Sequence, residues 1–102
     1  MKDSEKIMKK YPERIPIIVK KKEKSDIPDI DKKKYLVPKD MLINQFIFII
    51  RKRIKVTPEK AIFLTINNVM PSSTSSFAEL YEEHKNQNGF LDIIYSSENT
   101  FG

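Results

Sequence analysis

The chain has 102 residues, of which 39% are hydrophobic, so it can form one small core but is too short for two ordinary domains. The absence of cysteine excludes disulfide bonds, thiolate metal sites and a cysteine nucleophile, and two glycines are too few for a Gly-rich phosphate loop. The net charge of +5 divides into +9 over residues 1–55, which hold 17 of the 19 Lys/Arg and 8 of the 14 Asp/Glu, and −4 over residues 56–102.

The basic half begins with a predicted short helix followed by two predicted strands. Asp3 or Ser4 is suited to cap a helix over residues 5–10. Residues 15–19 are mostly β-branched and have a proline near the start, which is typical of a strand at an early or edge position. A polar connection then leads to a second short strand over residues 35–37.

The most apolar segment predicts a long helix that begins after Asp40, a residue suited to the N-cap. Its large apolar side chains recur at helical spacing and so lie on one face: Leu42, Phe46, Ile49, Ile50 and Ile54. The basic residues 51–53 fall in its last turn, where positive charge complements the carbonyl end of the helix dipole.

The second half of the chain alternates short elements with turns. Ser76 and Glu79 have the spacing of a capping box, which predicts a helix from there to about Lys85. The other expected elements are a proline-initiated turn at residues 57–60, a strand at 61–66, a turn at Asn67 and Asn68, a strand at 90–95 and a polar tail at 96–102.

This element order favours an α+β fold of the β-grasp type. Two strands, one long helix and two more strands would form a four-stranded mixed sheet around the helix, preceded by the short N-terminal helix. We expect one domain over residues 1–95 and a flexible C-terminal tail over residues 96–102. Element order alone is compatible with other small α+β folds.

Six segments in consistent order and spacing resemble the autophagy-related ubiquitin-like modifiers, the GABARAP and microtubule-associated light-chain group: KYPERIP (10–16), DKKKYLVP (31–38), residues 46–54 ending in RKRI, NNV (67–69), LYEEH (80–84) and YSSENTFG (95–102). The resemblance implies a non-enzymatic tag, cytoplasmic until it is lipidated and then held on autophagosomal membranes. There it would recruit cargo receptors and autophagy machinery.

The resemblance also assigns roles to the C-terminal tail. Gly102 would be joined by an amide to the amine of phosphatidylethanolamine, and Phe101 would be recognised with it. A terminal glycine has no side chain, so it suits narrow clefts of activating enzyme, conjugating enzyme and a processing and delipidating cysteine protease. The nucleophilic cysteines would belong to these partners, and no cofactor is implied.

A second implied site is a groove that binds cargo-receptor motifs with an aromatic and, three positions on, an aliphatic anchor. The aromatic pocket would use Ile7, Pro16, Lys34, Leu36 and Phe90, and the aliphatic pocket Tyr35, Val37, Met41, Phe46 and Ile49. Lys32, Lys34 and Arg51 would meet acidic residues that flank the motif. By burial statistics alone, Leu36, Phe46, Ile49 and Phe90 are better interpreted as ordinary core residues and the lysines as a solvated face, and only the resemblance favours the pocket.

The chain departs from the family pattern in three places. It begins too late to supply the further N-terminal helix of most relatives. Asn44 stands where a glycine is usual, and Thr65 stands where relatives often carry phenylalanine on a surface used by conjugation partners.

Two other classes of function compete with the one that the resemblance implies. An enzyme is disfavoured because His84, the one histidine, lies in a charged helix without a cysteine partner, and no cluster of residues has metal-ligand spacing. The stronger rival is a nucleic-acid or anionic-membrane binder that uses Lys20–Lys22, Lys32–Lys34 and Arg51–Arg53. The family resemblance implies no nucleic-acid partner.

Overall fold

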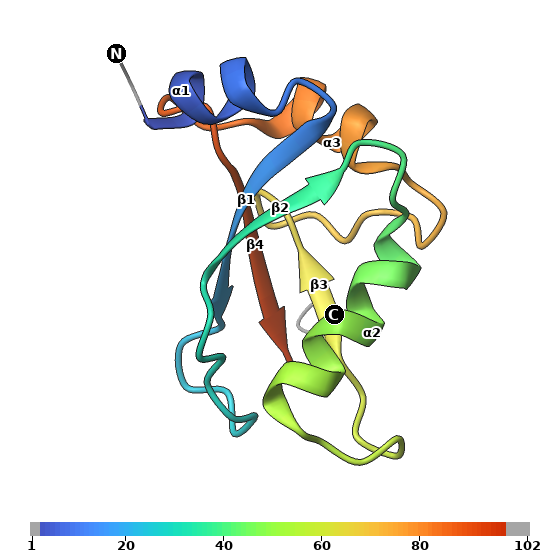
Figure 1. The fold of residues 1–102 in the computed structure, drawn as a ribbon. Coiled ribbons are helices and arrows are strands. Elements are labelled where there is room, and N and C mark those ends of the chain that lie inside the picture. Colours follow the sequence, from blue (N-terminus) through green and yellow to red (C-terminus); the bar gives the residue numbers. More distant parts are fainter. Residues whose placement is uncertain (1–2, 98–102) are drawn as a thin grey trace.

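The computed structural model describes residues 3–97, which form three helices and four strands (Figure 1). The helices are α1 (Asp3–Lys10), α2 (Ile43–Ile54) and α3 (Phe77–His84). The strands are β1 (Arg14–Lys21), β2 (Lys34–Pro38), β3 (Phe63–Thr65) and β4 (Leu91–Ser96). The expected order of elements is therefore confirmed.

The four strands form one mixed sheet in the order β2-β1-β4-β3. The central strands β1 and β4 run parallel, with Ile17 opposite Leu91, whereas β2 and β3 pair antiparallel with them at the two edges. The long helix α2 lies against the sheet, while α1 and α3 lie together near one end of it (Figure 1). This arrangement is the expected β-grasp, in which every strand is placed by pairing with a central strand.

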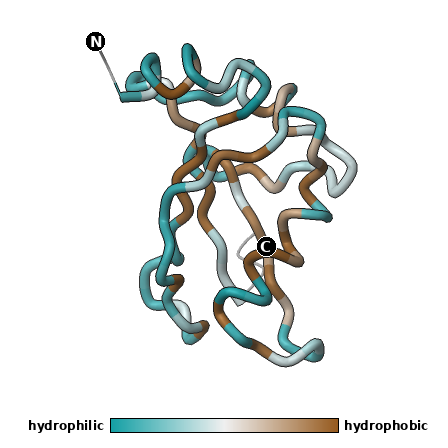
Figure 2. Tube along the Cα trace, viewed as in Figure 1, coloured by the Kyte–Doolittle hydropathy of each residue, from teal (hydrophilic) through white to brown (hydrophobic). Residues whose placement is uncertain are grey.

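The core fills the space between the sheet and α2. Phe46 of α2 is fully buried, and its ring makes edge-to-face contacts with Tyr35 of β2 and Phe77 of α3 at centroid distances of 5.5 and 5.4 Å. Hydrophobic positions follow the strands and one side of α2, whereas the connection between β1 and β2 is largely hydrophilic (Figure 2). Aromatic contacts of this kind join sheet and helices into one core.

The start of α2 differs from the expectation. The N-cap is Leu42 rather than Asp40, and its N–H donates to Gln45 Oε1 at 2.9 Å. The first helical N–H groups donate to carbonyls of the segment before α3: Ile43 to Ser75 and Asn44 to Ser73, both at 3.0 Å. A backbone partner from another segment has thus replaced the side-chain cap that the sequence predicted.

Smaller differences concern the ends of elements. Ser4 lies inside α1 and is buried, so it does not cap the helix. β3 is shorter than expected because its partner β4 pairs only with Phe63–Thr65. The turn at Asn67 and Asn68 is confirmed by positive φ angles of 52° and 65°, and the Ser76 cap by a bond of 3.2 Å from the Glu79 N–H.

Candidate peptide-binding groove

The strand β2 offers an open edge. In the described part of the chain it pairs with β1 alone. Because Pro16 has no N–H, its pairing with Leu36 is a non-hydrogen-bonded pair, so the Leu36 N–H and C=O point away from β1. The Leu36 carbonyl accepts a bond of 3.3 Å from Arg14 Nη1. An edge with outward backbone groups can accept an extended peptide as a further strand.

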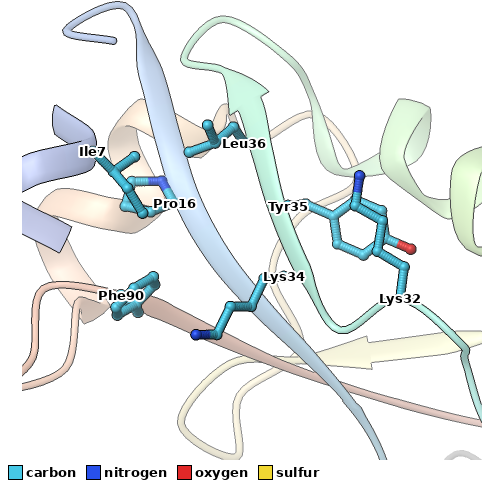
Figure 3. Close-up of a pocket in the computed structure, with 7 residues that line it drawn as sticks. All are labelled: Ile7, Pro16, Lys32, Lys34, Tyr35, Leu36 and Phe90. Atoms are coloured by element: carbon cyan, nitrogen blue, oxygen red, sulfur yellow. The ribbon is translucent and has the colours of Figure 1, made fainter. Parts of the chain in front are cut away.

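A hollow of about 290 Å³ lies beside this edge (Figure 3). Its lining comes from α1, β1, β2, the segment before β2 and the residue that precedes β4: Ile7, Pro16, Lys32, Lys34, Tyr35, Leu36 and Phe90. All five residues expected for the aromatic pocket are among them. In Figure 3, Tyr35 points to the other side of β2 from Lys34 and Leu36, as the alternation of side chains along a strand requires, and Lys32 lies beside Tyr35.

Two lysines place positive charge at this hollow. Lys34 Nζ lies 5.8 Å from the centroid of the Phe90 ring, and Lys32 Nζ lies 4.9 Å from that of Tyr35. Both lysines are exposed, whereas Phe90 and Tyr35 are buried. The hollow thus combines an apolar lining with cationic groups open to solvent, a combination suited to an aromatic side chain with acidic neighbours.

The residues expected for the aliphatic pocket are divided between core and surface. Val37 and Phe46 are buried, and Phe46 has no exposed surface. Met41 and Ile49 are half-buried and pack against the core, so they retain apolar surface that a ligand could cover. The Tyr35 hydroxyl is buried without a hydrogen-bond partner in the described residues, and burial raises the pKa of Tyr35.

Arg51 has a contact that the sequence did not suggest. Its Nη1 donates to the carbonyls of Thr57 at 3.0 Å and Lys60 at 2.7 Å, so the guanidinium holds the connection between α2 and β3. Its expected contact with acidic flanking residues stays a prediction. Nearby, Arg53 forms an ion pair with Asp31 at 3.1 Å.

The position of α1, which supplies Ile7 to the hollow, depends on a contact that the sequence also did not reveal. Ser4 Oγ donates to the Asn88 carbonyl, and the Tyr81 hydroxyl donates to the Gly89 carbonyl at 2.7 Å. Gly89 has a φ of +83°, and a Cβ there would lie 2.3 Å from Ser4 Oγ. The asparagine-rich composition around Gly89 indicates a turn, but no local signal reports a partner 84 residues away.

We expect Gly89→Ala to destabilise the protein and to weaken peptide binding at the hollow. A residue with a Cβ at this φ costs about 1–3 kcal/mol, and the clash with Ser4 would displace α1 and with it Ile7. Thermal unfolding and peptide titration would measure the two effects. Asn88→Ala is the matched control because it leaves in place the backbone carbonyl that Ser4 uses; equal losses in the two variants would contradict the prediction.

The histidine, the potential metal ligands and the helices of the described residues complete the picture of the surface. His84 ends α3, with Nδ1 3.1 Å from Asn67 Nδ2 and Nε2 3.5 Å from Glu83. Within residues 3–97, no group of three or more potential ligands could hold a metal ion, and none of the helices is long and apolar enough to cross a bilayer. Phe101 and Gly102 lie outside the described residues.

Comparisons with known proteins identify the family of the chain. The family model described as "Autophagy protein Atg8 ubiquitin like" matches residues 1–102. Autophagy-related protein 8d of Arabidopsis thaliana is 54% identical over 100 residues, which are 98% of this chain and 83% of that protein. Autophagy-related protein 8 of Schizosaccharomyces pombe is 56% identical over 100 residues, with the same coverage.

Two solved structures are similar in fold as well as in sequence. Trypanosoma brucei ATG8 has a TM-score of 0.89 at 39% identity and covers 98% of this chain and 86% of its own. Plasmodium falciparum Atg8 in complex with a Plasmodium falciparum Atg3 peptide has a TM-score of 0.86 at 37% identity, with coverage of 95% and 86%. The chain therefore belongs to the Atg8 family of ubiquitin-like autophagy proteins, which are modifiers and not enzymes.

Proposed function

We propose that this ubiquitin-like autophagy protein is conjugated through Gly102 to phosphatidylethanolamine and recruits cargo receptors to autophagosomal membranes through the hollow beside β2. Membership of the Atg8 family supports the conjugation, and Gly102 has no side chain to obstruct a narrow enzyme cleft. The protein would be cytoplasmic before lipidation. Its enzyme partners would be the activating and conjugating enzymes and a processing and delipidating protease.

The observation that carries the groove proposal is the hollow at an open strand edge. A cargo motif would extend β2 through the outward N–H and C=O of Leu36, and its aromatic anchor would enter the space between Ile7, Pro16 and Phe90. Its aliphatic anchor would cover Met41 and Ile49. The Atg3 peptide bound to the Plasmodium relative supports a conjugating enzyme as one peptide partner.

The distribution of charge favours peptides over nucleic acid. Four basic residues of the described part each form an ion pair with an acidic neighbour: Lys33 with Asp29, Lys39 with Glu13, Arg53 with Asp31 and Lys60 with Asp26. Pairs of this kind reduce the positive field that a phosphate backbone would need. Lys32 and Lys34 stand instead beside the apolar hollow, where they would meet the acidic flanks of a peptide.

We expect Leu36→Ala to weaken binding of an aromatic-x-x-aliphatic peptide about tenfold from a micromolar-range dissociation constant. The substitution removes apolar surface from the hollow, a loss of about 1–2 kcal/mol, and Leu36 is only half-buried, so the core stays filled. Isothermal titration of both proteins would measure the change. Ile94→Ala is the control because Ile94 is 38% exposed on β4 and does not line the hollow.

A scrambled peptide with the same acidic flanks separates the groove from the rival interpretation. A basic surface that binds by counterion release would bind both peptides equally and lose affinity steeply with salt. The groove requires the anchors at their spacing, so the scrambled peptide should bind far more weakly. Equal affinity of the two peptides would refute the groove.

A further inference from the structure

The point at which the chain leaves β4 is held by hydrogen bonds from the connection between β1 and β2. The Ser97 N–H donates to Ser25 Oγ at 3.3 Å, and the Ser97 hydroxyl donates to Asp26 Oδ1. The second carboxylate oxygen of Asp26 accepts from Lys60 Nζ at 3.1 Å. Backbone and side chain of Ser97 are thus both bound, by residues 72 and 71 positions earlier in the chain.

The segment that holds Ser97 is itself anchored to the core. Ile27 and Ile30 are buried, with 1% and 2% of their surface exposed. The hydroxyl of the fully buried Tyr95 donates to the Pro28 carbonyl at 2.8 Å. Ser25 is buried and its N–H donates to the Lys22 carbonyl at 3.1 Å. A polar connection that is fixed this firmly can hold another segment in place.

Lys60 and Asp26 add an electrostatic connection to a third segment. Lys60 belongs to the turn that Arg51 of α2 fixes through the Thr57 and Lys60 carbonyls. The hydrogen bond from Ser97, followed by Lys60, lowers the pKa of Asp26 below its usual value. At neutral pH the Asp26 carboxylate is therefore ionised and can accept both hydrogen bonds. These contacts would be lost only as the pH falls through the lowered pKa of Asp26.

We infer that Ser25, Asp26 and Lys60 form a latch on Ser97 that fixes the direction in which the C-terminal tail leaves the domain and so positions Gly102 for its enzymes. The inference rests on the proposed conjugation. Gly102 lies five positions after Ser97, so even a fully extended tail places the glycine within about 18 Å of the latch. Holding the origin of so short a tail restricts where Gly102 can be found and raises its effective concentration at a docked enzyme cleft.

The latch residues are positioning residues, and two readouts test them together. In Asp26→Ala, hydrogen exchange of the Ser97 amide, measured by NMR, should accelerate about tenfold, because the hydroxyl contact that holds this residue is lost. In a reconstituted lipidation reaction, the KM for the protein should rise severalfold with kcat unchanged. Asp26 is exposed, so the thermal unfolding of the variant should stay close to that of the wild type.

Matched variants sharpen the test. Ser97→Ala should reproduce the rise in KM and add little to Asp26→Ala, because both remove the same bond, whereas Ser97→Thr keeps a hydroxyl and should restore the wild-type KM. Asp29→Ala is the control: Asp29 is an exposed aspartate of the same connection, but its side chain bonds to Lys33.

The outcomes distinguish the latch from conjugation itself. If wild type is lipidated but Asp26→Ala matches it in KM and in Ser97 exchange, the latch is refuted and the proposed conjugation stands. A KM that falls in Asp26→Ala would equally overturn the positioning role, since the contact would then hinder the enzymes. If wild type forms no lipid product, the conjugation is refuted and the positioning role with it.

Discussion

A chain that lacks Gly102 should form no lipid-linked product when it is incubated with activating enzyme, conjugating enzyme and liposomes that contain phosphatidylethanolamine. The proposed amide requires a terminal carboxylate on a residue without a side chain, and after the deletion the chain ends in Phe101. Gly102→Ala should have the same outcome because the methyl group of alanine would clash with the walls of the narrow enzyme clefts. The product is measured by its altered electrophoretic mobility and by mass spectrometry.

The control for this experiment keeps the terminal glycine and changes the tail elsewhere. Asn99→Ala leaves both Phe101 and Gly102 in place, so it should be lipidated at a rate close to that of the wild type. Undiminished lipid product from the Gly102-deleted chain would overturn the proposed attachment site. The reaction therefore tests both the proposed conjugation and its site.

Phe46→Ala should lower the free energy of unfolding by about 3–5 kcal/mol, a large part of the stability of a domain of this size. Phe46 has no exposed surface, and its ring contacts both Tyr35 and Phe77, so the substitution leaves a cavity where sheet and helices meet. Chemical denaturation monitored by circular dichroism would measure the loss. Any reduction in peptide binding by this variant would come largely from the fold.

Ile49→Ala is the informative partner of that variant. Ile49 is on the same helix and is half-buried, so its truncation should cost less stability while it removes surface from the proposed aliphatic pocket. A Phe46→Ala protein as stable as the wild type would contradict the buried position of the ring. Comparison of the two variants separates a residue that supports the groove from one that could touch the ligand.

Local signals in the sequence were sufficient for the order of elements. Helical spacing identified α2, β-branched runs identified β1 and β4, and Ser76 with Glu79 identified the start of α3. The error at Asp40 has a physical cause. The N-terminal N–H groups of α2 are satisfied by carbonyls of the segment before α3, a long-range partner that makes a side-chain cap unnecessary.

The candidate site was less accessible to local reasoning. The apolar side chains of Leu36 and Phe90 indicated burial, but the sequence pattern could not show whether they line a hollow or belong to the core. Their assignment to one pocket came from the family resemblance. The contacts of Ser4 with Asn88 and of Asp26 with Ser97 were not predicted at all. Each joins segments that are more than 70 residues apart, which no periodic pattern reports.

The parallel pairing of β1 with β4 has a consequence for how the protein folds. Ile17 lies opposite Leu91, so the middle of the sheet closes only when residues 74 positions apart meet, and each edge strand depends on one of these two. Such a topology has high contact order and folds slowly for its size. During synthesis β4 emerges after the other three strands, although it lies at the centre of the sheet. Chains cut short before β4 would therefore expose unpaired strand edges and aggregate.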